Sequence, residues 1–380
     1  MNDRERFVNQ MHYRPVDRCP MWDFGFWDET LVRWHDEGLP AEVDGNGKAA
    51  TFFGMDQMAR GLSPNIGLLP AFDAGVIEDQ GDRVIYRDSA GVTYQQMKAA
   101  KTIPHFLDWT LRDMASWREH FLPRLDPDTP GRIPDNFAQR CREWADDRRD
   151  FPVAISGGSL YGWVRDWMGM ENLSIALFEQ PELFPTIVET IGTLICTVTE
   201  RALKIADAHG LHYDGCSMWE DMCFNHGPLV SPQIVRDVMG PWYQRITDLL
   251  GQYGCDVVWL DCDGKIDELV PIWLDNGVNC MFPVEVGVWN ADPYEFRRRW
   301  GKGCLMMGGF DKRILARGPE AIAAEIDRLA PLAGEGGFIP FCDHRVPADV
   351  SLADYLFYVQ RAKAVWGKGI HCRPTPEVGG

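Results

Sequence analysis

The sequence predicts an α/β fold, a (β/α)8 TIM barrel with an irregular N-terminal extension, and two observations lead to it. Beyond Pro152, short apolar runs alternate with helical stretches, as in a parallel sheet built from βα units. Successive runs end in acidic or other polar residues, and in a barrel these ends converge on one mouth. A doubly wound open sheet would favour a glycine-rich phosphate turn after its first strand, and Gly157-Gly158 is too weak a signal for that. Residues 1–380 are therefore expected to form one barrel domain.

The N-terminal part, residues 1–150, contains two recognisable elements in an otherwise irregular stretch. Residues 20–27, PMWDFGFW, form a short apolar run and are the candidate first strand of the barrel. Residues 83–87 and 92–94, joined by Asp88-Ser89-Ala90-Gly91, are typical of a β-hairpin with a short turn.

The main βα repeats occupy residues 151–366. Apolar runs predict strands at 153–156, 212–219, 255–261, 279–284, 304–307 and 338–341. Helices are expected at about 171–210, 232–253, 265–276 and 352–366, the last with an N-cap at Ser351. The run near Met21 and one strand that the pattern does not place would bring the barrel to about eight strands. Residues 367–380 have the character of a loose tail.

The amino-acid composition indicates which classes of binding partner are expected. The net charge of -18 and the pI near 4.9 argue against nucleic acid and anionic membranes, which both demand basic surface. No apolar run approaches the roughly 20 residues of a membrane span, and the start MNDRERFVNQ lacks an apolar signal core. The eleven cysteines have no disulfide-framework spacing, so a reducing cytoplasm is expected. The 15 tryptophans predict an aromatic-lined pocket as well as large core anchors. A homodimer is a further possibility that the sequence leaves open.

The stretch CDVVWLDCDG, residues 255–264, places two carboxylates where a buried strand ends. Because side chains alternate along a strand, Asp261 and Asp263 share one face and Cys262 takes the other. Two carboxylates this close repel each other unless a cation, a proton or a ligand lies between them. The alternative is that one of them caps a helix beginning near Lys265.

The ends of the predicted strands together bring a mixed set of polar side chains to the mouth. Carboxylates, a thiol and an imidazole could bind zinc, which accepts oxygen, sulfur and nitrogen ligands. The predicted metal ligands are Asp261, Asp263, Cys342 and His344, with Cys342 and His344 on one face by strand alternation. The predicted second ligands or proton donors are Glu220 and Glu285. Asp221 is a further predicted catalytic residue, and Asp343 lies nearby. The alternatives are a buried core Cys342 and a His344 that only bonds backbone.

Substrate contacts are expected from four further residues. Arg165 could hold a substrate carboxylate bidentately, or it could form a structural ion pair. Trp22 and Trp163 could stack a flat ligand, with core packing as the alternative, and Asp23 lies beside Trp22.

These residues together resemble the uroporphyrinogen decarboxylase-like superfamily, and most nearly its corrinoid-dependent methyltransferase branch. The resemblance covers most of the chain and is clearest in Arg14-Pro15 through Trp27, Gly158-Ser159-Leu160 with Arg165 and Gly169, Trp219-Glu220-Asp221-Met222, Leu260-Asp261-Cys262-Asp263-Gly264, Gly308-Gly309-Phe310-Asp311-Lys312-Arg313 and Gly336-Gly337-Phe338-Ile339-Pro340 through Asp343-His344.

The resemblance implies a TIM barrel with its site at the C-terminal mouth, a zinc ion, and a corrinoid carried by a separate protein. That branch usually ends one strand in His-x-Cys-Gly and the last in a single Cys. Here Asp261-Cys262-Asp263-Gly264 and Cys342 stand in those places, so a bound metal would have a shell richer in oxygen.

The leading hypothesis is a methyltransferase that moves a methyl group between a small methylated substrate and a separate corrinoid protein with the assistance of a metal. A methoxylated aromatic is one candidate substrate, which would make the reaction an O-demethylation. The first alternative is a metal-free decarboxylase of a small aromatic or pyrrolic acid, using Asp263 or Glu220 for the proton and Arg165 for the acid group. The second is a non-catalytic barrel that binds a ligand.

Overall fold

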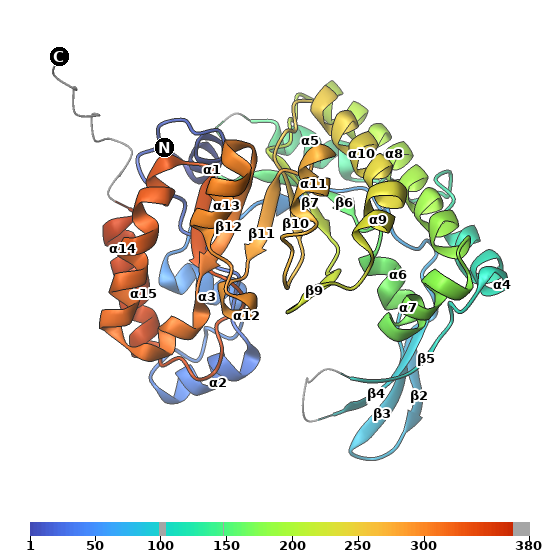
Figure 1. Ribbon diagram of the computed structural model, residues 1–380, viewed down its shortest axis with the longest axis horizontal. Coiled ribbons are helices and arrows are strands. Elements are labelled where there is room, and N and C mark those ends of the chain that lie inside the picture. The colour runs from blue at the N-terminus through green and yellow to red at the C-terminus, as the bar shows by residue number, and fades with distance from the viewer. Residues whose placement is uncertain (99–103, 147, 368–380) are drawn as a thin grey trace.

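The computed structural model describes residues 1–98, 104–146 and 148–367, and its centre is a curled sheet of seven parallel strands (Figure 1). Strands are neighbours in the order β1-β6-β7-β10-β11-β12-β13, which confirms the predicted barrel class. Their bounds are β1 Arg60–Gly61, β6 Val153–Gly158, β7 Gly215–Trp219, β10 Val258–Asp261, β11 Cys280–Val284, β12 Leu305–Phe310 and β13 Phe338–Cys342. The strand that the sequence pattern could not place is β1, which has only 2 residues. The tail expected at 367–380 lies outside the described residues except for Gly367.

The eighth position of the barrel is filled by an extended segment, residues 20–26, instead of a regular strand. Toward β1, the Asp56 amide donates a hydrogen bond to the Met21 carbonyl at 2.8 Å. Toward β13, the Val346 amide donates to the Gly25 carbonyl at 2.9 Å, and Phe26 forms an isolated parallel bridge with Val346. The first strand expected at 20–27 is therefore irregular, because Gly25 adopts a φ of +113° that interrupts an extended ladder.

Helices cover the outer face of the sheet and both of its ends (Figure 1). The predicted helices at 171–210 and 352–366 are present, and Ser351 caps the last by accepting a bond from the Asp354 amide. The helix expected at 265–276 begins only at Val270, because turns occupy residues 267–269. The helices are α1 Asp3–Met11, α2 Asp28–Asp36, α3 Asn46–Phe53, α4 Met114–Ser116, α5 Phe137–Trp144, α6 Gly162–Met168, α7 Met170–Glu179, α8 Leu183–Ala208, α9 Pro232–Ile234, α10 Gly240–Gln252, α11 Val270–Asp275, α12 Val286–Trp289, α13 Pro293–Trp300, α14 Pro319–Glu335 and α15 Leu352–Val365.

Two small antiparallel sheets lie outside the barrel. The predicted hairpin is present as β3 (Arg83–Arg87) and β4 (Val92–Met97), and it is flanked by β2 (Gly75–Asp79) and β5 (His105–Trp109). Most residues of β2 and β5 are exposed, so neither strand carries the apolar alternation that would have predicted it. The short pair β8 (Cys223–Phe224) and β9 (Gly227–Pro228) follows β7 at the rim of the mouth.

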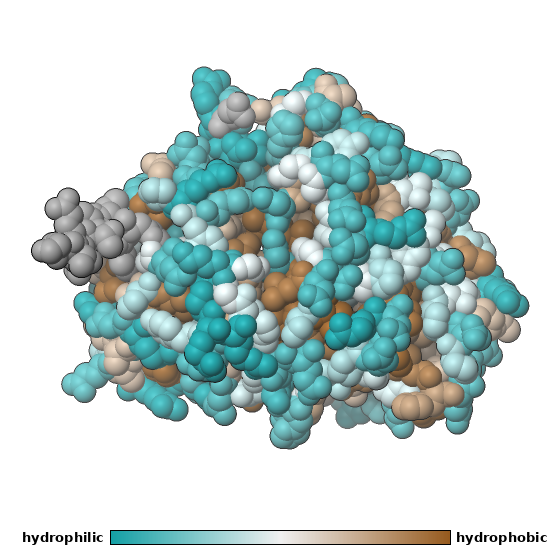
Figure 2. All heavy atoms as spheres, turned by 45° about the horizontal axis from the view of Figure 1, so that its top comes forward, coloured by the Kyte–Doolittle hydropathy of each residue, from teal (hydrophilic) through white to brown (hydrophobic). Residues whose placement is uncertain are grey.

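Helix α8 is, among the described residues, the one helix long and apolar enough to cross a membrane by length and composition. Its apolar side chains, such as Ile187, Ile191 and Ile195, are fully buried in the large core between strands and helices. Hydrophilic residues cover most of the face of the molecule in Figure 2, in keeping with the net charge of -18.

The barrel interior has its own apolar cluster, which α1 closes at the N-terminal end of the strands. Phe7 and Met11 of α1 pack there against inward side chains of the strands, and the Gly337 amide before β13 donates to the Gln10 carbonyl at 2.7 Å. Trp22 belongs to this floor, stacking on Phe7 with ring centroids 5.1 Å apart. The predicted role of Trp22 in stacking a flat ligand is therefore wrong, because its ring packs inside the core of the barrel floor.

Replacing Trp22 by alanine is expected to lower the free energy of unfolding by about 3–5 kcal/mol, because it leaves a cavity in the barrel floor. Trp27, whose side chain is 43% exposed, is the matched control, and Trp27→Ala should cost less than about 1 kcal/mol. Urea denaturation of both variants measures the difference. Equal, small losses would show that Trp22 does not hold the floor.

Candidate functional site at the barrel mouth

Three carboxylates meet at the C-terminal ends of the neighbouring strands β7 and β10. Asp221 follows β7 by two residues, Asp261 ends β10, and Asp263 follows two residues later. One oxygen of each carboxylate lies within 4.8 Å of the others. The Asp263 amide also donates a hydrogen bond to Asp221 Oδ1 at 3.2 Å, which ties the two loops together. The sequence reasoning had placed Asp221 outside the metal-ligand set.

The three carboxylates carry more negative charge than their surroundings balance. Burial raises the pKa of Asp261 to about 8, and the charges of Asp263, Asp221 and Glu285 add to the shift. Burial likewise raises the pKa of Asp221. Asp263 Oδ1 is buried, and within the described part of the chain it has no hydrogen-bond partner. A cation between these groups would remove the repulsion that raises both pKa values.

His344, in the loop after β13, faces Asp263. Its ring stacks on Phe24 with centroids 4.8 Å apart, and the ring of Trp27 lies at 5.8 Å. His344 Nε2 lies 3.4 Å from Asp263 Oδ2. The imidazole is thus oriented by aromatic packing toward the carboxylate group, as a predicted metal ligand would need to be.

Cys342 does not reach the mouth, which corrects its predicted role as a metal ligand. Ile339 and Phe341 of β13 point into the barrel interior, so Cys342 points outward into the large core and is fully buried there. The expectation that His344 shares its face failed because β13 ends at Cys342 and the chain then leaves the strand direction. Cys262 also faces outward, accepting a bond from the Met222 amide at 3.4 Å.

Glu220 is a positioning residue, which corrects its predicted role as a ligand or proton donor. It is fully buried, and both oxygens are engaged inside the protein. Oε2 accepts from Ser159 Oγ and from the amides of Tyr161 and Gly162, at 2.7–3.1 Å. Oε1 accepts from the Leu160 amide at 2.9 Å and from Tyr243 Oη at 2.7 Å. The carboxylate thereby fixes the N-terminus of α6, the helix that carries Trp163 and Arg165.

Arg165 forms the structural ion pair that was the alternative to gripping a substrate carboxylate. Its Nη1 donates to the Asp221 carbonyl at 2.6 Å, and Nη2 lies 3.7 Å from Asp221 Oδ2. Nε and Nη2 both donate to Asp166 Oδ1. This clamp holds Asp221 at a φ of +43°, a left-handed conformation that costs energy in a residue with a side chain.

Glu285 and Asp343 brace the loops on the other side of the mouth. The Gly264 amide donates to Glu285 Oε2 at 2.6 Å, and Lys312 Nζ lies 3.7 Å from Oε1. Burial raises the pKa of Glu285 to about 7, so its predicted part in proton transfer near neutral pH stays a prediction. Asp343 accepts from the amides of Gly287 and Lys312, at 2.6 and 3.0 Å.

Asp23 lies away from the mouth, which corrects its predicted contact with substrate. Its side chain is buried, and Oδ2 accepts a hydrogen bond from Tyr355 Oη on α15. Burial raises the pKa of this carboxyl to about 6.

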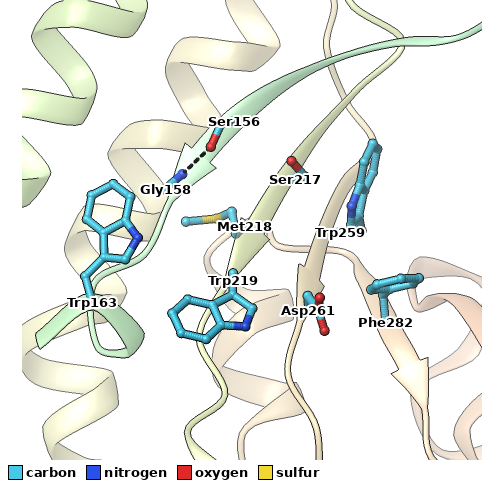
Figure 3. Close-up of a pocket in the computed structure, with 9 residues that line it drawn as sticks. All are labelled: Ser156, Gly158, Trp163, Ser217, Met218, Trp219, Trp259, Asp261 and Phe282. Atoms are coloured by element: carbon cyan, nitrogen blue, oxygen red, sulfur yellow. Dashed lines mark hydrogen bonds between the residues drawn. The ribbon is translucent and has the colours of Figure 1, made fainter. Parts of the chain in front are cut away.

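An aromatic-lined pocket of about 220 Å³ adjoins the carboxylates (Figure 3). The strand register places Trp219 and Phe282 directly beside Asp261 on the two neighbouring strands. Trp259 shares the face of Asp261 two residues earlier on β10. The remaining lining residues are Trp163 from α6, with Ser156, Gly158, Ser217 and Met218. Of the pocket residues the sequence reasoning named Asp261 and Trp163, although the i, i+2 relation of Trp259 to Asp261 was a further usable signal.

Thiolate-bound zinc of the kind implied by the resemblance does not fit these residues. Burial raises the pKa of both the Cys262 and Cys342 thiols well above the usual range, and both sulfur atoms face the outer core. The mouth offers carboxylate oxygen from Asp221, Asp261 and Asp263, with the His344 imidazole adjoining. Carboxylate oxygens suit magnesium, calcium and manganese, and imidazole extends the set toward zinc. The residues fit a divalent cation held mainly by oxygen.

Comparison with known proteins shows a shared fold. No protein-family model matches the chain, and no curated protein matches it. A methyltransferase from Methanosarcina mazei is similar in structure, with a TM-score of 0.54 and 14% identity, covering 97% of this chain and 99% of that one. A B12-independent methionine synthase from Shewanella sp. W3-18-1 has a TM-score of 0.39 and 10% identity over 61% of this chain and 65% of its own, too weak a likeness to bear on the fold. The barrel implied by the family resemblance is confirmed by the first structure.

Glu220→Gln is expected to lower the free energy of unfolding by about 2–4 kcal/mol, because an amide NH2 would then face the backbone donors of α6. Glu189→Gln, at an exposed position of α8, should change it by less than about 0.5 kcal/mol. Urea denaturation compares the two. Unchanged stability together with lost activity would return Glu220 to the catalytic groups.

Asp23→Asn is expected to remove one pH dependence of stability. The unfolded carboxyl ionises near pH 4, whereas the folded one keeps its proton up to about pH 6, so this group makes folding less favourable as pH rises between these values. The unfolding free energy of Asp23→Asn should rise relative to the unsubstituted protein by about 3 kcal/mol between pH 4 and pH 7. Denaturant titrations at both pH values measure it, and a constant difference would contradict the shifted pKa.

Proposed function

We propose that this chain is a methyltransferase that moves a methyl group from a small methylated substrate to the cobalt of a corrinoid carried by a separate protein. The observation that carries the proposal is the aromatic pocket opening beside Asp261 at the barrel mouth. The fold shared with a known methyltransferase supports it. The ten cysteines of the described residues are all free, which supports the proposed cytoplasmic location.

Each group at the mouth has a separate task in this reaction. The pocket walls hold the substrate so that one methyl group points out of the mouth toward the approaching cobalt. Asp221, Asp261 and Asp263 would hold a divalent metal, with His344 as a further donor. When bound, such a metal supplies Lewis acidity toward the heteroatom that carries the methyl group. Glu285, with its pKa of about 7, can give a proton to an oxygen leaving group near neutral pH.

The decarboxylase alternative has weaker support. It needs a cation to hold the acid group of the substrate, and Arg165 is already bonded to Asp221 and Asp166. Lys312 lies against Glu285 and is likewise engaged. A methoxylated aromatic and a methylated ammonium ion both offer apolar methyl groups to the pocket walls, so either suits methyl transfer.

The purified chain is loaded with manganese or zinc and mixed with a methylated donor and a cobalt(I) corrinoid. We expect methylcobalt(III) to form, and the absorbance change of the corrinoid measures its formation. Asp261→Asn should lower the rate by at least about 100-fold, because it removes the carboxylate shared by the pocket and the metal ligands. The exposed Asp349→Asn is the control and should retain full activity. Methyl transfer that Asp261→Asn leaves unchanged would contradict this site, and release of CO₂ from an aromatic acid without methyl transfer would favour the decarboxylase.

A further inference from the structure

We infer that the aromatic pocket binds a small methylated ammonium cation, with its N-methyl groups against Trp163, Trp219, Trp259 and Phe282 and its positive charge facing Asp261. The inference names the substrate class for the site and rests on the proposed function, because the ammonium ion would be the methyl donor. Its basis is the combination of an unpaired carboxylate, aromatic walls on several sides of it and a small cavity between them (Figure 3).

Asp261 is a carboxylate without a partner in the protein. No described residue donates a hydrogen bond to its side chain or forms an ion pair with it, and every influence on its pKa is an unfavourable one. The nearby basic groups are committed elsewhere, Arg165 to Asp221 and Asp166, and Lys312 to Glu285. His344 faces Asp263 instead. A positive ligand would therefore supply the partner that this carboxyl lacks, and its charge would favour the ionised form of the group.

The aromatic side chains around Asp261 are placed as a cation would require. Register puts the rings of Trp219 and Phe282 on either side of Asp261, while Trp259 stands one inward position deeper on the same strand. All three rings, and that of Trp163, are only partly buried and line the cavity. Aromatic faces attract cations, and such walls are the usual recognition surface for methylated ammonium groups.

Arg165 shows that one of these rings already accepts a cation. Its guanidinium carbon lies 5.1 Å from the centroid of the Trp219 ring. The same side chain is anchored to Asp221, so it cannot move into the pocket without breaking that bond. The carboxyl group of Asp261 therefore has no cationic partner from the protein.

Size and charge disfavour the other substrates. The cavity of about 220 Å³ is smaller than the roughly 300–1,000 Å³ that drug-sized ligands occupy, which suits a compact head group. A carboxylated aromatic would bring a negative charge to this acidic group, and a neutral ether would do nothing to favour the ionised form of Asp261. A divalent metal on the three carboxylates would not reverse this preference, because three negative charges against two positive ones leave the group negative.

For a quaternary ammonium donor the methyl transfer balances without an acid, and neither a metal nor Glu285 acts on the nitrogen, which has no free electron pair. The electron pair of cobalt(I) attacks the methyl carbon, the C–N bond breaks, and nitrogen keeps the bonding pair. The products are methylcobalt(III) and a neutral tertiary amine, so cobalt is oxidised by two electrons and the methyl group is transferred with no proton consumed.

The test compares choline with 3,3-dimethylbutan-1-ol, which has the same shape but no charge. Binding of each to the chelator-treated full chain in phosphate buffer is measured by calorimetry and by quenching of tryptophan fluorescence. Choline is expected to bind at least about 10-fold more tightly than the alcohol, as expected for a cation facing aromatic rings and a carboxylate. Asp261→Asn should weaken choline by a similar factor and leave the alcohol unchanged, whereas Asp349→Asn should change neither.

Equal affinity for choline and its neutral isostere, or tighter binding of methoxybenzene than of choline, would overturn the inference even if Asp261→Asn failed to fold. Methyl transfer from methoxybenzene to cobalt(I) without binding of choline would refute the cationic substrate and leave the proposed methyltransferase standing. Selective binding of choline without any methyl transfer would keep the ammonium site and refute the proposed methyl transfer.

Discussion

The repulsion among Asp221, Asp261 and Asp263 is the constraint on which the mouth of this barrel depends. Parallel strands β7 and β10 are neighbours, so their C-terminal ends and the loops that follow bring the three carboxylates within 4.8 Å of one another. In water such a group would be unremarkable, but partial burial strengthens the repulsion and raises the pKa values of Asp221 and Asp261. A cation at this point would satisfy groups that the protein itself leaves unmatched.

The scaffold separates structural carboxylates from available ones by how it supplies hydrogen-bond donors. Glu220 and Asp343 receive backbone amides and serve to fix α6 and the loops after β11 and β12. Asp261 receives none and faces the pocket instead. The structural and the available carboxylates both follow strands at the same end of the barrel. The surroundings of each carboxylate, and not its residue type, therefore decide its role. Glu220 acts indirectly, since the helix it holds carries both Trp163 and the arginine that clamps Asp221.

Sequence reasoning reached the barrel class, most of its strands and the acidic end of β10, because apolar periodicity and strand alternation are local properties. It misplaced Cys342 and wrongly gave it the same face as His344, since alternation holds only while the strand continues and β13 ends at Cys342. Glu220 and Asp221 are adjacent in sequence yet have opposite roles, which depend on donors about 60 residues away in the β6 to α6 turn. The pocket walls needed the pairing register of three strands, which no single stretch contains.

The most direct test of cation binding at the barrel mouth is an anomalous-scattering map from crystals of the full chain soaked with Mn²⁺. An anomalous peak about 2.0–2.6 Å from oxygens of Asp221, Asp261 and Asp263 is the predicted result, because oxygen-bound divalent ions lie at these distances. The contradicting result is manganese bound at other sites with no anomalous peak between these three side chains. It would show that their repulsion does not shape the site.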